Sequence, residues 1–462
     1  MANLLLIDFG STYTKVTAVD PINERILGVA KSFTTVETDI KQGYDRAVKE
    51  LKEKIGAIDC DVKLACSSAA GGLRMVTIGL VPDLTVKASK LAALSAGAKV
   101  TKVFAYDLSL KEAEEIDGLK PDIVLLTGGT DGGNKDVILH NAKVLAQLDW
   151  EFPVVVAGNK SVSDRVVKIL EESGKEALLC ENVLPSLDSL NIEPVRECIR
   201  NVFLRRIIQA KGITKMQNLL EGILMPTPSA VLNAARLLAL GQKDEPGWGD
   251  LMVVDVGGAT TDVYSITAGS PTQTGVILKG FPEPYAKRTV EGDLGVRYSA
   301  RALTEAVGLE KVMEYSKLTE EEVLGYLERY RQNPDLLSEQ DEKMQAMDWA
   351  LAALAVRNAV ERHAGILETV YTPFGATFLQ SGKDLTEIKT FIGTGGPVLN
   401  TIDKTAALSQ CLFERENPTQ LKPKNPDFFL DSKYILAAMG LLAEKYPRAA
   451  LRIMKRELAQ LV

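Results

Sequence analysis

The sequence predicts an α/β protein of two lobes that share one local design, and three observations support this fold class. First, 462 residues are more than a single hydrophobic core usually serves. Second, short apolar runs alternate with amphipathic stretches along the first half, which indicates strand and helix units with parallel pairing. Third, a glycine-rich turn carrying an aspartate occurs once in each half with the same internal spacing.

The first lobe is expected to span residues 1–222 as alternating strands and helices. Its candidate strands are short β-prone runs bounded by turn residues. Its candidate helices show apolar residues that recur at intervals of three and four. The strands are expected at 4–9, 16–20, 62–67, 102–106, 121–129, 153–158 and 177–183, and the helices at 44–55, 84–96, 137–148 and 163–172.

The second lobe is expected to span residues 223–462 and to begin with a helix after Pro228. The strand run LMVVDVGGATTDVYSI follows a polar turn rich in Pro and Gly, and a hairpin partner is expected near 275–278. A helical subdomain is expected at about 297–365, and its charged stretch is interpreted as a solvated face. A late strand, KTFIGTGG, precedes a loop broken by prolines and then terminal helices from Tyr434 onward.

Composition argues against several classes of function. A formal net charge of −7 and a pI of about 5.3 argue against nucleic-acid binding, which depends on Lys and Arg patches. Five scattered cysteines without a CxxC pair argue against a zinc or iron–sulfur site and are interpreted as reduced thiols. Two histidines leave little room for histidine-based acid-base or metal chemistry. The start MANLLLIDFGS indicates neither a signal peptide nor a membrane span, so a cytoplasmic protein is expected.

The repeated turn is the main functional signal in the sequence. DFGSTYT at 8–14 and DVGGATT at 255–261 each follow an aliphatic run and precede another β-prone run, so both are interpreted as hairpin turns. Glycine permits positive φ and close approach, which lets successive amides point into one concavity, and nearby hydroxyls add donors. Such a concavity suits a polyphosphate. The predicted phosphate donors are Gly10, Ser11, Thr12, Gly257, Gly258 and Thr260.

The aspartates that begin the two turns, Asp8 and Asp255, are candidate magnesium ligands and catalytic groups. Both are expected to end buried strands and to face one cleft, where an ionised carboxylate is costly without a cation. Magnesium held largely through water fits between these carboxylates and a triphosphate. The alternative is that both are ordinary tight turns, with glycine for geometry and aspartate as a local cap.

A third glycine cluster, FIGTGGPVLN at 391–400, again follows an apolar strand and precedes a helix. Backbone at Gly393, Thr394, Gly395 and Gly396 is a candidate surface for a nucleobase or ribose, because no bulky side chain obstructs the glycines. The chain contains neither the GxGxxG dinucleotide pattern nor the GxxxxGK[ST] phosphate loop. Taken alone, the cluster is equally compatible with a packing role.

Taken together and in order, these motifs resemble the actin, hexokinase and heat-shock-chaperone superfamily of ATPases. LLLIDFGSTYTKV resembles its first phosphate motif, MVVDVGGATTDVYSI its second, FIGTGGPVLN its adenosine motif, and YILAAMG at 434–440 the helix that links its lobes. The resemblance implies a two-lobed actin-like fold of duplicated ribonuclease H-like domains, with a nucleotide cleft between the lobes and a terminal helix that returns to the first lobe. Ala259 stands where the superfamily often has a third glycine, and its amide is a further candidate phosphate contact.

Within that superfamily, the chain is similar to the MutL-type (GlmL) accessory proteins of adenosylcobalamin-dependent glutamate mutase. The motifs CSSAAGGLRM, VLLTGGTDGGN, MPTPSAVL and VEGDLG carry this resemblance together with those above. It implies a reactivating chaperone that uses ATP and magnesium to release damaged cobalamin from its mutase, so that intact coenzyme can bind. The mutase would hold the corrinoid, because this chain has no DxHxxG pattern.

Four further side chains are candidates for contacts around the nucleotide, whose β–γ bond is hydrolysed mainly through positioning and charge neutralisation. Asp262 is expected to orient the attacking water. Lys15 either contacts a phosphate or lies on the surface. Glu291 and Asp293 in VEGDLG, by similarity to the seventy-kilodalton heat-shock chaperones, either contact ribose or metal-bound water or cap a helix.

Two other functions are open on the same fold. A small-molecule kinase would transfer the phosphoryl group to a sugar or carboxylate substrate, and an actin-like scaffold would polymerise with MgATP. The identity of the mutase, the need for a second subunit and the oligomeric state are not encoded in any motif.

Overall fold

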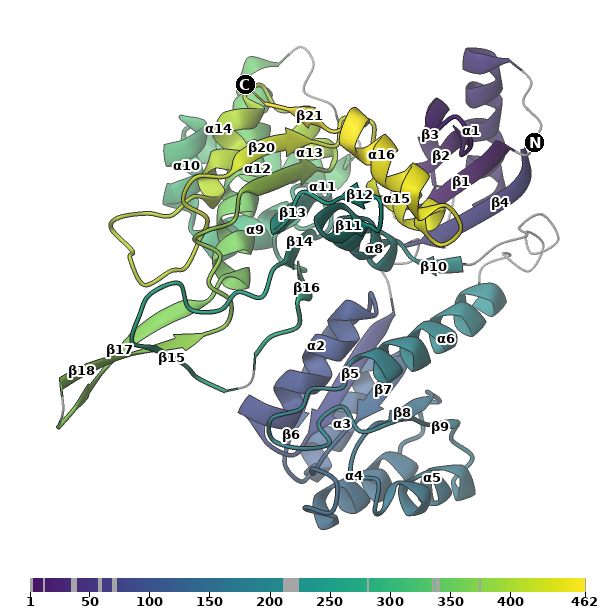
Figure 1. The fold of residues 1–462 in the computed structure, drawn as a ribbon, viewed down its shortest axis with the longest axis vertical. Coiled ribbons are helices and arrows are strands. Elements are labelled where there is room, and N and C mark those ends of the chain that lie inside the picture. The colour runs from purple at the N-terminus through teal and green to yellow at the C-terminus, as the bar shows by residue number, and fades with distance from the viewer. Residues whose placement is uncertain are drawn as a thin grey trace. The chain divides into compact units, whose positions relative to one another are not determined.

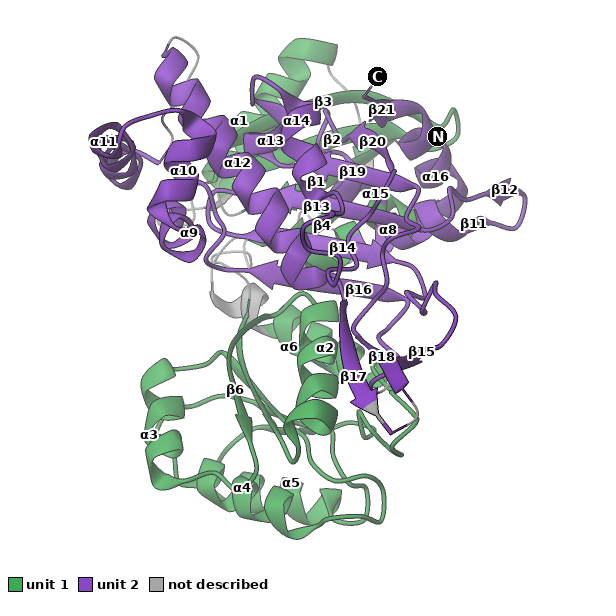
Figure 2. Ribbon diagram, turned by 90° about the vertical axis from the view of Figure 1, so that its left-hand side faces the viewer, with its two compact units in different colours: residues 1–231, 440–445 green, residues 232–439, 446–462 purple. Residues whose placement is uncertain are grey.

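The computed structural model describes residues 3–10, 13–34, 40–56, 60–68, 73–210, 224–280, 282–334, 336, 341–373 and 375–461. The chain folds into two compact units (Figure 2). Unit 1 comprises Met1–Val231 and Gly440–Lys445, and unit 2 comprises Leu232–Met439 and Tyr446–Val462. The chain therefore changes unit inside two helices, α8 and α15, and once more soon after α15.

The first sheet of unit 1 is built from a meander and two parallel additions (Figure 1). The first strand, β1, pairs antiparallel with β2, and β2 pairs antiparallel with β3. On the other side β4 is parallel to β1, and β10 is parallel to β4. Helix α1 (Ile40–Ile55) packs on this sheet through Tyr44, Ala47 and Leu51, which recur on one helix face and are buried. The strands are β1 (Asn3–Phe9), β2 (Tyr13–Asp20), β3 (Arg25–Phe33), β4 (Cys60–Ser67) and β10 (Leu224–Pro226).

The main sheet of unit 2 repeats this arrangement. Its first strand, β13, pairs antiparallel with β14, and β14 pairs antiparallel with β16. On the other side β19 is parallel to β13 and β20 is parallel to β19, while β21 adds an antiparallel edge strand. The strands are β13 (Leu251–Val256), β14 (Thr261–Ile266), β16 (Ala286–Glu291), β19 (Thr390–Thr394), β20 (Asp427–Leu430) and β21 (Ala459–Gln460).

The two sheets therefore share strand order and strand direction. In each, the central strand starts a three-stranded antiparallel meander on one side and has two parallel strands on the other. The glycine-rich turn joins the same two strands in both sheets, β1 to β2 and β13 to β14. The predicted α/β class, with ribonuclease H-like sheets duplicated in one chain, is confirmed by this topology.

A second sheet of unit 1 lies in the sequence between β4 and β10. Its five strands are all parallel, in the order β6-β5-β7-β8-β9. Buried residues of α3, α4 and α5 form one apolar core with Val76 and Ile78 of β5, and α2 and α6 contact each other. The elements are β5 (Arg74–Gly79), α2 (Lys87–Ser95), β6 (Lys99–Ala105), α3 (Leu110–Leu119), β7 (Ile123–Leu126), α4 (Asp136–Ala146), β8 (Val154–Val156), α5 (Ser163–Glu172), β9 (Ala177–Leu179) and α6 (Glu193–Ala210).

Helix α12 (Glu342–His363) lies in the core of unit 2 and is buried along most of its length. Helix α11 begins with a capping box in which Thr319 and Glu322 bond each other's backbone amides. The remaining helices are α8 (Thr227–Leu240), α9 (Ala300–Val307), α10 (Leu309–Ser316), α11 (Glu320–Gln332), α13 (Gly396–Leu399), α14 (Lys404–Leu408), α15 (Leu436–Ala443) and α16 (Pro447–Glu457).

A small separate sheet of unit 2 corrects one sequence-based expectation. Strand β15 (Val276–Leu278) pairs in parallel with β18 (Gly375–Ser381), which pairs antiparallel with β17 (Ile366–Thr372). The hairpin partner expected near 275–278 is therefore wrong. The run beginning at Leu251 already folds back on itself at its glycine turn, so β14 takes the partner position. The short strands β11 (Gly241–Gln242) and β12 (Glu245–Pro246) form a further hairpin.

The core of unit 2 contains a buried lysine that gives stability a defined pH dependence. The Lys383 side chain is 1% exposed, and its ammonium donates to the carbonyl oxygens of Thr267 at 2.8 Å and Tyr285 at 2.9 Å. Burial, together with the nearby charge of Lys287, lowers the pKa of Lys383 from 10.5 to about 7. Between these two pKa values the unfolded chain holds a proton that the folded chain has lost, so this group makes stability rise with pH.

Replacing Lys383 by methionine is expected to flatten that pH dependence. In the wild type, Lys383 should add on the order of 2 kcal/mol to the free energy of unfolding between pH 7 and pH 9, at about 1.4 kcal/mol per pH unit. The variant lacks the titrating group and should show a correspondingly smaller rise. Urea unfolding of both proteins at the two pH values measures the difference. Equal pH dependence in the two proteins would contradict the assignment.

Candidate functional site

The first glycine turn is a tight hairpin whose geometry requires glycine at position 10. Phe9 pairs with Thr14 across β1 and β2, and the Gly10 amide donates to the Tyr13 carbonyl oxygen at 3.0 Å. A Cβ at Gly10 would lie 2.5 Å from that oxygen, which is too close for any other residue without backbone movement. Two predicted phosphate donors, Ser11 and Thr12, lie outside the described residues.

Asp8, the second-to-last residue of β1, is a buried carboxylate with three partners. Thr227 donates its hydroxyl to Oδ1 at 2.6 Å, and the Cys66 thiol donates to the same oxygen at 3.5 Å. Lys15, opposite Asp8 on β2, places its ammonium 3.6 Å from Oδ2. Burial and the neighbouring Asp8 carboxylate raise the pKa of the Cys66 thiol well above its usual value, so Cys66 stays protonated as a donor. Lys15 was predicted either to contact a phosphate or to lie on the surface, and the structure shows a third role for it, an ion pair with Asp8.

The second glycine turn closes in the same way as the first. Asp255 pairs with Asp262 across β13 and β14, and the Gly257 amide donates to the Thr260 carbonyl oxygen at 2.9 Å. A Cβ at Gly257 would lie 2.9 Å from that oxygen. The predicted hairpin interpretation is therefore confirmed for both turns, and each has a glycine amide bonded to the carbonyl three residues later.

Three carbonyl oxygens of the second turn accept hydrogen bonds from one segment of unit 2. Amides of Val296 and Arg297 donate to the carbonyls of Gly257 at 3.2 Å and Gly258 at 2.9 Å. The Ser299 hydroxyl donates to the carbonyl of Ala259 at 2.7 Å. In a trans peptide the C=O and the following N–H point in opposite directions.

It follows that the amides of Gly258, Ala259 and Thr260 point away from residues 296–299. Amides turned to one side in this way are what an anion-binding turn requires, and their contact with phosphate stays a prediction. The segment packs closely, because a Cβ at Gly295 would lie 2.3 Å from the carbonyl carbon of Ala259. The VEGDLG motif supplies that glycine, which gives it a local role in shaping the turn.

Asp262 is held by a buried arginine from β16. The Arg288 guanidinium is 4% exposed and donates from Nε to Asp262 Oδ1 at 2.7 Å. The Thr260 hydroxyl donates to the other carboxylate oxygen at 3.3 Å. This buried ion pair gives Asp262 a structural role beside the predicted one of orienting water, which stays a prediction.

The two acidic residues of VEGDLG are paired with an arginine of α12. Arg362 donates from Nη1 to Glu291 at 2.8 Å, and from Nη1 and Nη2 to Asp293 at 2.7 and 2.9 Å. These bonds from Arg362 lower the pKa of Asp293. The N-cap residue of α9 is Ser299, so the alternative in which Glu291 or Asp293 caps that helix is wrong.

The structure brings the third glycine cluster beside the second turn. Strand β19 runs parallel to β13 with Thr394 opposite Asp255. Gly395 has φ 95° and ψ 145°, and a Cβ there would lie 2.1 Å from the Val256 carbonyl oxygen and 2.8 Å from Asp255 Oδ1. A residue with a side chain would therefore push directly on the end of β13.

The three glycines of this cluster face different surroundings. A Cβ at Gly393 would meet side chains of Leu408 at 2.8 Å and Val398 at 3.2 Å, which is a packing position. At Gly396 the nearest atom to an added Cβ is 3.8 Å away, the hydroxyl of Tyr434. Of the three, Gly396 is the one at which backbone borders open space, as a nucleobase or ribose contact requires.

Sequence reasoning missed Asp431, which ties this cluster to α15. Asp431 is 2% exposed and accepts bonds from the amides of Ile435 at 2.7 Å and Leu436 at 3.1 Å. The Thr394 hydroxyl donates to the same carboxylate at 3.3 Å. An aspartate a few residues before the apolar run YILAAM is a recognisable helix-start signal, and it was available in the sequence.

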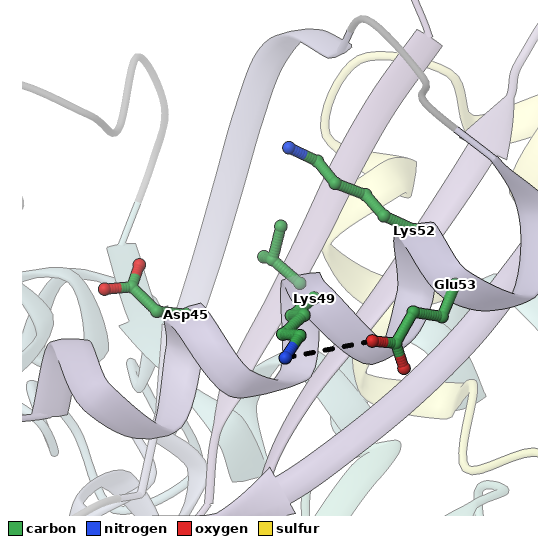
Figure 3. A pocket seen from close by; sticks show the side chains of 5 residues that line it. Asp45, Lys49, Lys52 and Glu53 are labelled. Atoms are coloured by element: carbon green, nitrogen blue, oxygen red, sulfur yellow. Dashed lines mark ion pairs between the residues drawn. The ribbon is translucent and has the colours of Figure 1, made fainter.

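A hollow on the surface of unit 1 lies apart from these residues in sequence. It has a volume of about 430 Å³ and is lined by Asp45, Val48, Lys49, Lys52 and Glu53, all on α1. Figure 3 shows Lys49 and Glu53 joined by an ion pair, with 3.9 Å between the charged atoms. The lining belongs to a single exposed helix face, and none of the predicted site residues is among it.

Two searches of the described part of the chain gave negative findings. Within it, no group of three or more His, Cys, Asp or Glu side chains is arranged to hold a metal ion. Nor does any helix there have the length and apolar character needed to cross a membrane.

Comparisons with known proteins give a family and several remote structural likenesses. Residues 4–458 match the family model MutL, described as MutL protein. Protein MutL of Clostridium tetanomorphum is 50% identical over 458 residues, which cover 99% of each chain. The solved ethanolamine utilization protein EutJ from Carboxydothermus hydrogenoformans is 12% identical with a TM-score of 0.32, over 98% of this chain and 90% of that one. A solved glycerol dehydratase reactivase is 10% identical with a TM-score of 0.33, over 96% and 99%.

Proposed function

Because the chain belongs to the MutL protein family, we propose that it is a cytoplasmic, ATP-dependent reactivating chaperone for an adenosylcobalamin-dependent mutase of the glutamate mutase type. In this proposal ATP binding and hydrolysis bias a conformational change that exchanges damaged for intact cobalamin on the mutase. The mutase holds the corrinoid, and this chain supplies the nucleotide-driven movement.

The observation that carries the proposal is the direction of the peptide groups in the second turn. Carbonyls of Gly257, Gly258 and Ala259 are bonded to residues 296–299, so the following amides are aimed the other way as a set of donors. The first turn closes by the matching bond between Gly10 and Tyr13. We propose that the two turns contact the phosphates of one ATP, with Gly396 beside the nucleoside.

The carboxylates at the two turns fit a hydrated magnesium ion. Asp8 and Asp255 are each the second-to-last residue of the first strand in their sheet, just before the glycine turn. Asp8 is pre-oriented by Thr227 and Cys66, and Asp255 is half-buried beside Gly395. Oxygen donors of this kind are those that magnesium prefers, and it usually keeps several of its waters. When bound, the ion would neutralise charge on the β- and γ-phosphates.

The residues of the chain would assist hydrolysis mainly by positioning. Amides of the two turns would hold the phosphate oxygens, and the Thr260 hydroxyl would turn from Asp262 to donate to a phosphate. Asp262 would orient the attacking water, with Arg288 fixing the direction of its carboxylate. Lys15 would keep its ion pair with Asp8 or turn to a phosphate when ATP is present.

Thr227 provides a test of the magnesium assignment. Replacing it by valine keeps the side-chain shape but removes the hydroxyl that donates to Asp8 at 2.6 Å. The magnesium concentration needed for half-maximal ATP turnover is expected to rise about 10–100-fold, as for other residues that orient a metal ligand. Titration of the ATPase rate with magnesium chloride measures this. Thr227→Ser should behave as the wild type; an unchanged magnesium requirement in Thr227→Val would contradict the assignment.

Coupling to a mutase requires that ATP bind one conformation better than another. A ligand shifts a conformational equilibrium only by its difference in affinity for the two states. Driving such an equilibrium from 1:99 to 99:1 needs about 5.5 kcal/mol of that difference. Hydrolysis would reset the bias, which gives a chaperone a reason to consume ATP.

A reactivation assay tests the proposed function directly. A glutamate mutase carrying inactive cobalamin is incubated with the protein and MgATP, and activity is then assayed with added adenosylcobalamin. Recovery of mutase activity that needs both the protein and hydrolysable ATP is expected. If recovery is absent, and a sugar or hydroxy-carboxylate instead accelerates ADP release and becomes phosphorylated, the protein is a kinase and the proposal is wrong.

A further inference from the structure

Two cysteines of unit 1 lie on segments that two hydrogen bonds hold side by side. Cys180 directly follows β9, and Cys198 lies in α6. On one side of the pair, Arg205 of α6 donates to Glu176 before β9 at 2.6 Å. On the other side, Asn191 before α6 donates to Glu181 at 2.9 Å. Because these two contacts bracket the cysteines, the stretch 176–181 runs along α6 in the opposite direction.

The position of Cys198 on α6 directs its side chain toward residues 176–181. Cys198 and Arg205 are seven residues apart, so they lie on the same face of α6, and Arg205 is the residue that reaches Glu176. The main chain at Cys180 is fixed by its amide, which donates to the Val156 carbonyl oxygen at 2.9 Å. Under these constraints Cys198 faces the stretch that carries Cys180, near enough for each thiol to shift the pKa of the other.

Both thiols of the pair are accessible to solvent, and one of them has a lowered pKa. Both side chains are partly exposed. The hydrogen bond from Cys180, with the positive charge of Arg205, lowers the pKa of Cys198, while the same bond raises the pKa of Cys180. The thiolate is the nucleophile in thiol chemistry, so Cys198 is the attacking group and Cys180 the resolving one.

We propose that Cys180 and Cys198 form a redox-active dithiol that is oxidised to a disulfide by small-molecule disulfides such as oxidised glutathione. The Cys198 thiolate attacks one sulfur of oxidised glutathione, which breaks its S–S bond and releases one glutathione. The Cys180 sulfur then attacks the Cys198 sulfur of the mixed disulfide and releases the second glutathione. Two electrons pass to the glutathione disulfide, and the two thiol protons end on the released glutathiones.

The other cysteines provide the contrast that makes the proposal selective. Cys66 and Cys411 are 0% exposed, and burial raises the pKa of both thiols. Cys60, at the start of β4, is partly exposed and lies far along the chain from both members of the pair. Selectivity for Cys198 therefore follows from its neighbour and its charge environment. The site is independent of the residues assigned above to nucleotide.

Peptide mapping after incubation with oxidised glutathione tests this. The folded full-length protein is treated, quenched with an alkylating reagent and digested, and disulfide-linked peptides are identified by mass spectrometry. A Cys180–Cys198 cross-link that a dithiol reductant reverses is expected, formed at least about tenfold faster than modification of Cys60. Absence of this cross-link, or faster modification of Cys60, would overturn the proposal.

Two variants separate the roles of the partners. In Cys180→Ser the resolving thiol is gone, so Cys198 should accumulate as a stable mixed disulfide with glutathione. In Cys198→Ser, Cys180 should react at least about tenfold more slowly than Cys198 does in the first variant. Equal rates in the two variants would show that Cys198 is not the attacking group.

Discussion

Replacing Asp255 by asparagine is expected to lower the rate of ATP turnover by about 10²–10³, as loss of one preorganised electrostatic contact does in other enzymes. Asparagine keeps the size of the side chain and removes its charge. The half-buried carboxylate belongs to the second-to-last residue of β13, just before the turn and beside Gly395. Release of phosphate from MgATP by the purified variant and the wild type measures the effect.

The matched control is Asp244→Asn, at an exposed position in the turn between β11 and β12 of the same unit. It makes the same chemical change away from the proposed site, so turnover should equal that of the wild type. Unchanged turnover in Asp255→Asn, with thermal unfolding also unchanged, would show that Asp255 has no part in ATP hydrolysis.

Replacing Gly395 by alanine is expected to lower the free energy of unfolding by more than about 2 kcal/mol and to abolish most ATP turnover. The backbone there has φ 95° and ψ 145°, a conformation that costs about 1–3 kcal/mol for a residue with a side chain. The new methyl group would also lie 2.1 Å from the Val256 carbonyl oxygen and 2.8 Å from Asp255 Oδ1. Relief of that overlap must move the end of β13, and with it the Asp255 carboxylate.

Gly396→Ala is the control that separates stability from binding. Its added methyl group has no neighbour closer than 3.8 Å, so stability should change by less than about 0.5 kcal/mol. If backbone at Gly396 borders the nucleoside, the affinity for ADP should fall in this variant even though folding is intact. Urea unfolding and ADP binding by calorimetry check the two effects. Equal stability of the two glycine variants would contradict the structural account.

The parts of the fold that sequence predicts well are those determined by local chemistry. The two glycine turns are read from a carboxylate, glycines and hydroxyls within a few residues, and both form the expected hairpins. Helix α5 spans Ser163–Glu172, the bounds that its apolar spacing predicts. Strand β3 (Arg25–Phe33) was missed because it is mostly half-buried and carries no continuous apolar run. Strand β5 (Arg74–Gly79) was missed beside a glycine-rich stretch that indicates a loop.

The parts of the site that sequence could not supply depend on contacts between distant segments. Residues 296–299 lie about 40 positions beyond the second turn, yet they bond the carbonyls of Gly257, Gly258 and Ala259. Arg288 and Asp262 form a buried pair across two strands, a contact that composition cannot reveal. The sequence suggested Glu291 and Asp293 as ligand contacts, whereas in the fold both accept hydrogen bonds from Arg362. In each case only the fold brings the two partners together.

The measurement that tests the central claim most directly is a crystal structure of the protein with magnesium and a nonhydrolysable ATP analogue. The account predicts that the triphosphate contacts backbone amides at residues 10–12 and at 258–260 together, with the metal between it and the Asp8 and Asp255 carboxylates. A nucleotide bound elsewhere, or one held by a single turn while the other faces solvent, would contradict it.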